Sequence, residues 1–262
     1  MFSDLSDSNQ RSLLLQQITN DMAKVDAIPL KGIAKTWLYN NYVMTFITWP
    51  FIIYDFPPSF VNTITAIVKR YLKRWLHLHK TARPELLFLA CPGLGVKNPT
   101  TSLKSLHIVK HLILSKSDDP RTRFVANANH AKAAAANDKR WKPEIEAVEI
   151  EKEIRWEEKY MPKKHTSKSA KVAPPFGACS HKAQRQLITK RFKEKEAEAM
   201  RVRLIDLCRC GNFVAWDRIM DHDISWKEMV FDLSEHVLSF RLNNIAMTLP
   251  SWSNLNRWGI KR

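Results

Sequence analysis

The stretch FPPSFVNTITAIVKRYLKRWLHLHK, residues 56–80, predicts a helix with two different faces. Pro57 and Pro58 favour a helix start, because proline lacks the backbone N–H that the first helical turn leaves unpaired. Apolar residues then recur at steps of three and four, which places them on one broad face. We expect that face to pack against a core. Its members are Phe60, Val61, Ile64, Ile67, Val68, Tyr71, Leu72, Trp75 and Leu76.

The opposite side of this predicted helix is cationic. Its basic residues are Lys69, Arg70, Lys73 and Arg74. No acidic residue occurs between Phe56 and Arg83 to neutralise them. Two interpretations remain open: a core helix with a solvated basic face, or a helix whose basic face binds a polyanion. Tyr71 and Trp75 share the apolar face, so we interpret them as core residues and not as base-stacking residues.

Composition favours a polyanionic partner. The 262 residues are enough for one large or two modest domains, and 45% of them are hydrophobic. With 42 Lys and Arg against 26 Asp and Glu, the formal net charge is +16. Such an excess suggests nucleic acid or an anionic membrane surface before a small-molecule substrate. Only six glycines occur, with no GxGxxG or Walker-type loop, which argues against a β-barrel or a phosphate-cradling α/β fold.

The apolar run at 37–54, WLYNNYVMTFITWPFIIY, resembles a membrane span in composition only. It contains Asn40, Asn41, two threonines and Pro50, and it is shorter than a bilayer requires. We expect instead a buried helix at 31–49, which Pro50 ends or kinks. The acidic, polar N-terminus shows no secretory leader, so we expect an intracellular protein, nuclear or cytoplasmic.

No catalytic, metal-binding or cofactor-binding residues are predicted. Cys179-Ser-His181 and Cys208-Arg-Cys210 contain zinc-type ligands, but their spacing differs from that of structural zinc sites. Asp118 and Asp119 lie in SKSDDPRTR, where we expect a turn or a helix cap and not a catalytic metal pair. With Cys91 included, the four cysteines are expected to be reduced thiols.

These patterns together predict a mainly α protein. We expect a helical bundle at 1–120, with helices at 8–25, 31–49 and 56–80, and a loop or short strand pair at 85–101. A helical extension at 121–160 ends in the acidic helix 143–160, a solvated helix facing basic neighbours. A flexible basic linker is expected at 161–180. The remainder, 181–262, is expected to hold a long basic helix, at 181–210, and a small helical subdomain with a helix at about 234–245.

Two separated strings resemble one protein family. The string LKGIAKTWLYNNYVMTFITWPFIIYDFPPSFVNTI, followed by IVKRYLKRWLHLHK, is similar to the segment after the palm in reverse transcriptases of non-LTR (LINE-type) retrotransposons. There a W-P-x-x-x-Y-D-x-P pattern leads into the thumb. The matching positions are Lys35, Trp37, Tyr39, Trp49, Pro50, Tyr54, Asp55, Pro57, Lys73, Trp75 and Leu76.

The second string, LPSWSNLNRWGI, resembles the sequence before the C-terminal cysteine/histidine knuckle of the same family. Its matching positions are Leu249, Pro250, Asn254, Leu255, Arg257 and Trp258. Both strings occur in the family's order. Neither the aromatic-x-Asp-Asp motif of the palm nor the knuckle occurs within residues 1–262.

The resemblance implies a thumb-like bundle and a catalytically incomplete, nucleic-acid-binding fragment of a reverse transcriptase. A thumb lays a helix along the template-primer hybrid, and cations on that helix neutralise phosphates. We therefore expect RNA or the backbone of an RNA/DNA hybrid as the partner, without a transmembrane segment. The alternative is a helical interaction or scaffold protein whose basic faces bind an acidic partner or a membrane surface. The expected phosphate contacts are Lys69, Arg70, Lys73 and Arg74, with Lys31 and Lys35 on the preceding helix.

Overall fold

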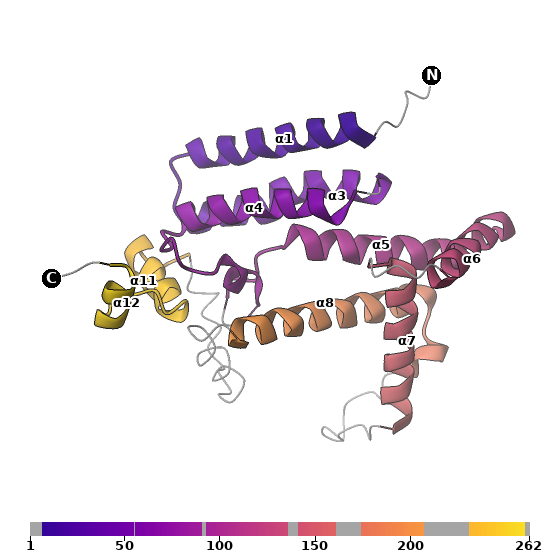
Figure 1. Ribbon diagram of the computed structural model, residues 1–262. Coiled ribbons are helices and arrows are strands. Elements are labelled where there is room, and N and C mark those ends of the chain that lie inside the picture. The colour runs from indigo at the N-terminus through magenta and orange to yellow at the C-terminus, as the bar shows by residue number, and fades with distance from the viewer. Residues whose placement is uncertain are drawn as a thin grey trace. The chain divides into compact units, whose positions relative to one another are not determined.

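The computed structural model describes residues 7–54, 56–90, 93–135, 141–160, 174–206 and 231–259. Within these ranges the chain forms helices and connecting segments without a β-strand, which confirms the mainly α prediction. The chain divides into two compact units, and Figure 1 labels most of their α-helices. Unit 1 combines residues 1–102 with 197–262, and unit 2 comprises residues 103–196.

The helices of unit 1 come from both ends of the chain. They are α1 (Asp7–Ala27), α2 (Gly32–Leu38), the π-helix η1 (Tyr39–Val43), α3 (Met44–Ile53), α4 (Pro58–Trp75), the 3-10 helix η2 (Pro84–Phe88), α11 (Glu235–Ile245) and α12 (Trp252–Arg257). Unit 2 contains α6 (Pro120–Ala135), α7 (Pro143–Tyr160) and the 3-10 helix η3 (Phe176–Ala178). Two helices, α5 (Pro99–Ser115) and α8 (His181–Asp206), contribute residues to both units.

Helix α4 has the predicted buried face. Val61, Ile64, Val68 and Leu72 are fully buried, and Trp75 is only 4% exposed. Helices α1 and α2 both contact α4. The apolar face of residues 58–75 is therefore part of the core of unit 1, as its periodicity predicts.

The inner face predicted for the helix 8–25 comprises Leu13, Leu14, Gln17, Ile18 and Met22 or Val25, and α1 differs from it at Leu13 and Gln17, which are exposed. Its buried residues are Leu14, Ile18, Met22 and Val25. Leu13, also expected inside, is 57% exposed, because one residue along a helix turns a side chain by about 100° away from the buried face.

A glycine brings α2 close to the end of α4. A Cβ atom at Gly32 would lie 1.8 Å from the carbonyl oxygen of Trp75, so no other residue fits this approach without movement. The Gly32 N–H donates to Glu235 Oε1 at 2.8 Å, which links α2 to α11. These contacts place α2 and α11 beside the C-terminal end of α4.

The run 31–54 differs from the single helix that we expected. The π-helix η1 separates α2 from α3, and α3 continues through Pro50 to Ile53. One side is buried, with Tyr39 and Phe51 fully covered. Four aromatic residues are instead exposed, so the prediction of a buried helix holds for one side only: Trp37, Tyr42, Phe46 and Trp49. Among the helices that the structure describes, none has the length and apolarity that a membrane crossing requires.

Unit 2 has its own hydrophobic core. It gathers buried residues from α5, α7, η3 and α8: Ile108, Leu112, Ala147, Ile150, Phe176, Ile188 and Phe192. Phe176 lies inside the linker predicted at 161–180, and residues 161–173 of that linker lie outside the described residues. At Phe176 the linker prediction is wrong, because a single aromatic side chain in a polar stretch is fully buried.

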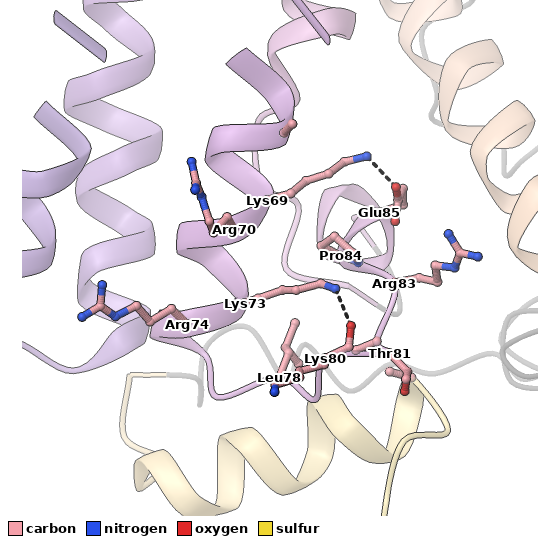
Figure 2. A pocket seen from close by; sticks show the side chains of 13 residues that line it. Lys69, Arg70, Lys73, Arg74, Leu78, Lys80, Thr81, Arg83, Pro84 and Glu85 are labelled. Atoms are coloured by element: carbon pink, nitrogen blue, oxygen red, sulfur yellow. Dashed lines mark hydrogen bonds and ion pairs between the residues drawn. The ribbon is translucent and has the colours of Figure 1, made fainter. Parts of the chain in front are cut away.

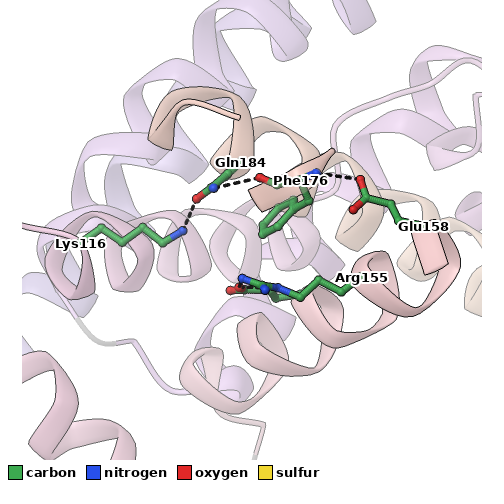
Figure 3. Close-up of polar contacts among 6 residues, drawn as sticks. Lys116, Arg155, Glu158, Phe176 and Gln184 are labelled. Atoms are coloured by element: carbon green, nitrogen blue, oxygen red, sulfur yellow. Dashed lines mark hydrogen bonds and ion pairs between the residues drawn. The ribbon is translucent and has the colours of Figure 1, made fainter. Parts of the chain in front are cut away.

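Polar contacts fix Phe176 on both sides of its backbone, as Figure 3 shows. Its N–H donates to Glu158 Oε1 at 2.8 Å, and its carbonyl accepts from Gln184 Nε2 at 3.0 Å. Gln184 also accepts from Lys116 Nζ. The Arg155 guanidinium lies 5.6 Å from the centre of the Phe176 ring. The segment is therefore an integrated part of unit 2.

The C-terminal helices begin at serine caps. Ser234 Oγ accepts from the Val237 N–H at 3.4 Å and Ser251 Oγ from the Asn254 N–H at 3.3 Å. The first cap agrees with the helix predicted at about 234–245. Predicted elements at 207–230, together with Cys208 and Cys210, lie outside the described residues, as do Asp55 and Cys91.

Candidate nucleic-acid interface

A cavity of about 1000 Å³ lies in unit 1 beside the second half of α4. We call it the cationic cavity, because six of the residues that line it are lysine or arginine. Figure 2 shows α4 on one side and the segment 80–85 on the other. The lining residues are Ala66, Lys69, Arg70, Lys73, Arg74, Leu78, Lys80, Thr81, Ala82, Arg83, Pro84, Glu85 and Ala246.

Apolar packing positions both sides of this cavity. The buried face of α4 turns its basic residues outward, as the period of the sequence requires. On the other side, Ala82 and Leu86 are buried in one cluster with Leu204 and Ala246. The backbone N–H of His79 donates to Asn243 Oδ1 at 2.9 Å. The segment that follows α4 is thus held by residues more than 100 positions later in the chain.

Two lysines of α4 reach across the cavity to acceptors on the far side (Figure 2). Lys69 Nζ lies 2.5 Å from Glu85 Oε1. Lys73 Nζ donates to the carbonyl oxygen of Lys80 at 2.9 Å. Burial alone would raise the pKa of Glu85, but the Lys69 hydrogen bond and the charges of Lys69 and Arg83 outweigh it, so that pKa is lowered. Among the described residues that line the cavity, Glu85 is the one acid.

Lys73 lies in an environment that disfavours its positive charge. Burial, the largest influence, lowers the pKa of the Lys73 ammonium group. Glu85 opposes this shift, while Arg83 and Lys69 add to it, and the net direction is downward. An anion bound in the cavity would relieve this repulsion, since a nearby negative charge favours a protonated lysine.

Arg74 and Lys35, both expected to contact phosphate, have acceptors within unit 1. Arg74 Nη1 lies 2.8 Å from Asp26 Oδ2, and the Trp75 indole donates to Asp26 Oδ1 at 2.9 Å. Lys35 Nζ donates to the Asp26 carbonyl oxygen at 2.8 Å. Lys31 is exposed at the start of α2. Neither Lys31 nor Lys35 is among the residues that line the cavity.

Three cations of the cavity are exposed and available to an outside anion: Arg70, Lys80 and Arg83. Within the described part of the chain, their side-chain nitrogens have no hydrogen bond or ion pair. Of the three, the sequence predicted only Arg70. Lys80 and Arg83 belong to the same acid-free stretch as α4, and that shared absence of acid was the signal that could have identified them.

The cations of α8 have a different environment. Within unit 2, Arg191 pairs with Glu157, and Lys195 Nζ lies 3.3 Å from both Glu146 and Glu153. These acids belong to α7, so the acidic helix faces basic neighbours, as predicted. The positive charge of the predicted basic helix 181–210 is thereby neutralised at Arg191 and Lys195.

Asp119, a possible metal ligand in the sequence, has a structural role. Asp119 caps α6, accepting at Oδ2 from the Thr122 N–H at 2.9 Å, which confirms the cap interpretation. Hydrogen bonds from Thr122 and Arg121 lower the pKa of the Asp119 carboxyl group. In the described part of the chain, no group of three or more histidine, cysteine or acidic side chains is placed to hold a metal ion.

The chain was compared with protein-family models, with curated proteins and with solved structures, and no match was found in any of the three. The resemblance to LINE-type reverse transcriptases therefore rests on the motifs quoted above. Several of those motif residues have clear structural roles. Tyr39 and Trp75 are buried, and Asn254 Nδ2 donates to the carbonyls of Met247 and Leu249 at 3.1 and 2.7 Å.

Proposed function

We propose that the protein binds the phosphate backbone of RNA, alone or paired with DNA, through the cationic cavity. The observation that carries the proposal is the gathering of six cations and one acid around a single cavity of unit 1. Arg70, Lys80 and Arg83 are exposed there and available to phosphate oxygens. Arginine is well suited to this role, because its planar group donates two parallel hydrogen bonds to a phosphate.

The lowered pKa of Lys73 supports an anionic ligand. Burial is the main cause of this lowered pKa; the charge of Glu85 opposes the shift, and the charges of Arg83 and Lys69 add to it. A phosphate would favour the protonated form and make a charge-assisted hydrogen bond. The resemblance to a polymerase thumb points to the same class of ligand. Backbone contacts of this kind would be independent of base sequence and would weaken steeply with salt.

A salt series on paired triple variants tests the proposal. Binding of a labelled 16-nucleotide RNA, and of the same RNA in a blunt RNA/DNA hybrid, is measured by fluorescence anisotropy at increasing salt. For the variant R70Q/K80Q/R83Q we expect about tenfold or greater loss of RNA affinity at low salt. Its slope of log affinity against log salt should be shallower by about 2, since each contact with a single strand contributes roughly 0.7.

The matched control removes the same charge from unit 2. The variant R123Q/K152Q/K182Q changes three exposed cations outside the cationic cavity, and we expect less than about threefold loss from the change in net charge alone. If both triple variants lost RNA affinity equally, the cationic cavity would not be the binding site. Absence of binding by the folded wild-type chain to either ligand at low salt would reject nucleic-acid binding itself.

A second candidate function is binding to an acidic protein partner or a membrane surface. The exposed aromatic residues of α2, η1 and α3 favour it, because Trp37, Tyr42, Phe46 and Trp49 are all exposed and no charged residue lies between them in the sequence. A partner held mainly by such a surface would respond little to salt. The same salt series, run with that partner, therefore separates the two candidates.

A further inference from the structure

A second cavity lies next to the cationic one. It has a volume of about 550 Å³ and is also part of unit 1. The segment 77–81 separates the two cavities: Leu78, Lys80 and Thr81 line the cationic cavity, while His77 and His79 line the second. Neighbouring residues of this short segment therefore line different cavities. A ligand that crosses this segment would contact both cavities.

The second cavity is lined by ring systems. The Trp258 indole stacks on the His79 imidazole, with ring centres 3.9 Å apart and planes inclined by 20°. Phe240 also lines this cavity and is 59% exposed. Of the described residues that line it, none is lysine or arginine. We call it the aromatic cavity. Exposed flat rings stack on nucleic-acid bases of any sequence, because every base has a π-face.

Two of the polar side chains that line it, Asn243 and Glu235, already make hydrogen bonds within the protein. Asn243 Oδ1 accepts from the His79 N–H and from Thr248 Oγ1, and Asn243 Nδ2 donates to the His77 carbonyl. Glu235 Oε1 accepts from the Gly32 N–H. Asn243 and Glu235 are therefore engaged, whereas the buried Trp258 Nε1 has no hydrogen-bond partner among the described residues. A base could stack on the rings of this cavity.

We propose that these two cavities together bind single-stranded nucleic acid, with phosphates in the cationic cavity and an unstacked base on Phe240 and the rings beside it. This inference rests on the proposed function and names the form of its ligand. A duplex keeps its bases paired and stacked inside the helix, so it offers phosphates to the first cavity but no base to the second. A single strand offers both.

Phe240 provides the sharpest test. We compare wild-type protein with the variants Phe240→Ala and Phe124→Ala. Each is titrated against the labelled 16-nucleotide RNA and its labelled blunt hybrid, and inorganic polyphosphate is added as a competitor. Phe124 is a matched control because it is 74% exposed on α6 of unit 2. We expect the wild type to prefer the single strand to the hybrid by about tenfold or more. Phe240→Ala should lose about tenfold on RNA, as expected for one stacked base, and less than twofold on the hybrid and on polyphosphate.

A double variant tests the side of the cationic cavity that lies opposite α4. The double variant K80Q/R83Q should weaken RNA binding and hybrid binding alike, because both ligands offer phosphates to the cationic cavity. Thermal unfolding of each variant checks that its fold is retained. Equal affinity of the wild type for strand and hybrid, or an unchanged RNA affinity in folded Phe240→Ala, would overturn the inference. Either result leaves backbone binding by the cationic cavity intact, whereas loss of all binding rejects both.

Discussion

Two lysines on two basic helices show opposite electrostatic environments. Burial is the largest single influence on each, and it favours the neutral form. For Lys73 on α4, Glu85 opposes burial but does not outweigh it, Arg83 and Lys69 add to it, and the pKa is lowered. For Lys195 on α8, Glu146 and Glu153 outweigh it and the pKa is raised. The first helix lies in a local excess of positive charge, and the second lies beside acids that neutralise it.

This difference shows that the number of cations on a helix does not define a polyanion-binding surface. Both helices are rich in lysine and arginine, and both carry an apolar face that fixes which side is exposed. What separates them is the position of the acids. Within unit 2, α7 supplies Glu146, Glu153 and Glu157 to the α8 cations. Around the cationic cavity, Glu85 is the one acidic lining residue.

The largest expected effect concerns the buried face of α4. Leu72 is fully buried, so Leu72→Ala should lower the free energy of unfolding by about 2–5 kcal/mol, through lost burial and the cavity left behind. Urea unfolding followed by circular dichroism measures this change. RNA affinity should fall with the folded fraction, because α4 then no longer positions its cations.

Ile67→Ala is the control for this change. Ile67 lies on the same helix at an intermediate level of exposure, so we expect about half the effect or less. If Leu72→Ala were no more destabilising than Ile67→Ala, the packed face of α4 would be wrongly assigned and the comparison of the two helices would lose its basis.

A smaller effect should follow from removing the acids that face α8. The variant E146Q/E153Q/E157Q leaves Lys195 and Arg191 without their α7 partners. These pairs are partly exposed, so the triple should cost about 1–2 kcal/mol of unfolding free energy. The released cations should raise RNA affinity by about tenfold and steepen its salt dependence by roughly 1–2. Anisotropy titrations across salt measure both quantities.

The matched control removes three acids that are exposed and have no recorded ion pair in the described part of the chain: Asp118, Glu149 and Asp232. D118N/E149Q/D232N changes the net charge equally, and we expect only about a two- to threefold rise in RNA affinity. An equal rise in both triples would mean that net charge, and not local pairing by α7, distinguishes the two basic helices.

Local sequence predicted the features that local geometry determines. The three- and four-residue steps of 58–75 predicted the buried face of α4, because a helix has a fixed rotation per residue. Pro57 and Pro58 predicted its start, and Asp119 predicted a cap. The exposed direction of the α4 cations followed from the same period. These inferences need no knowledge of the rest of the chain.

Features that depend on distant residues could not be predicted in this way. The acid-free stretch at 56–83 implied unpaired cations, yet Lys69 meets Glu85 and Arg74 meets Asp26 from outside that stretch. Phe176 is buried although its neighbours in sequence are polar, because α5, α7 and α8 surround it. The aromatic cavity joins His79 to Trp258, across most of the chain. Such pairings are set by tertiary packing alone.

The smallest expected effect tests Glu85, the acid that makes the cationic cavity least like an ideal phosphate site. Its pKa lies below the ordinary value of 4.5 because the hydrogen bond and charge of Lys69 outweigh burial. A carboxyl group whose pKa is lowered on folding stabilises the folded state above its ordinary pKa, and that contribution is lost as the pH falls through the lowered value. Glu85→Gln should therefore lower stability at pH 7 by about 1 kcal/mol or less.

The difference between wild type and Glu85→Gln should then close as the pH falls from about 5 to 3, measured by thermal unfolding at each pH. At pH 7 the same variant should bind RNA about threefold more tightly, because Lys69 loses a charged competitor for the phosphate. Glu151→Gln removes the half-buried partner of Arg155 on α7 and serves as the control, with affinity expected to change by less than twofold. If Glu85→Gln instead weakened RNA binding, Glu85 would be positioning Lys69 for the ligand, and the cavity would resemble the paired surface of α8 more than an open cationic site.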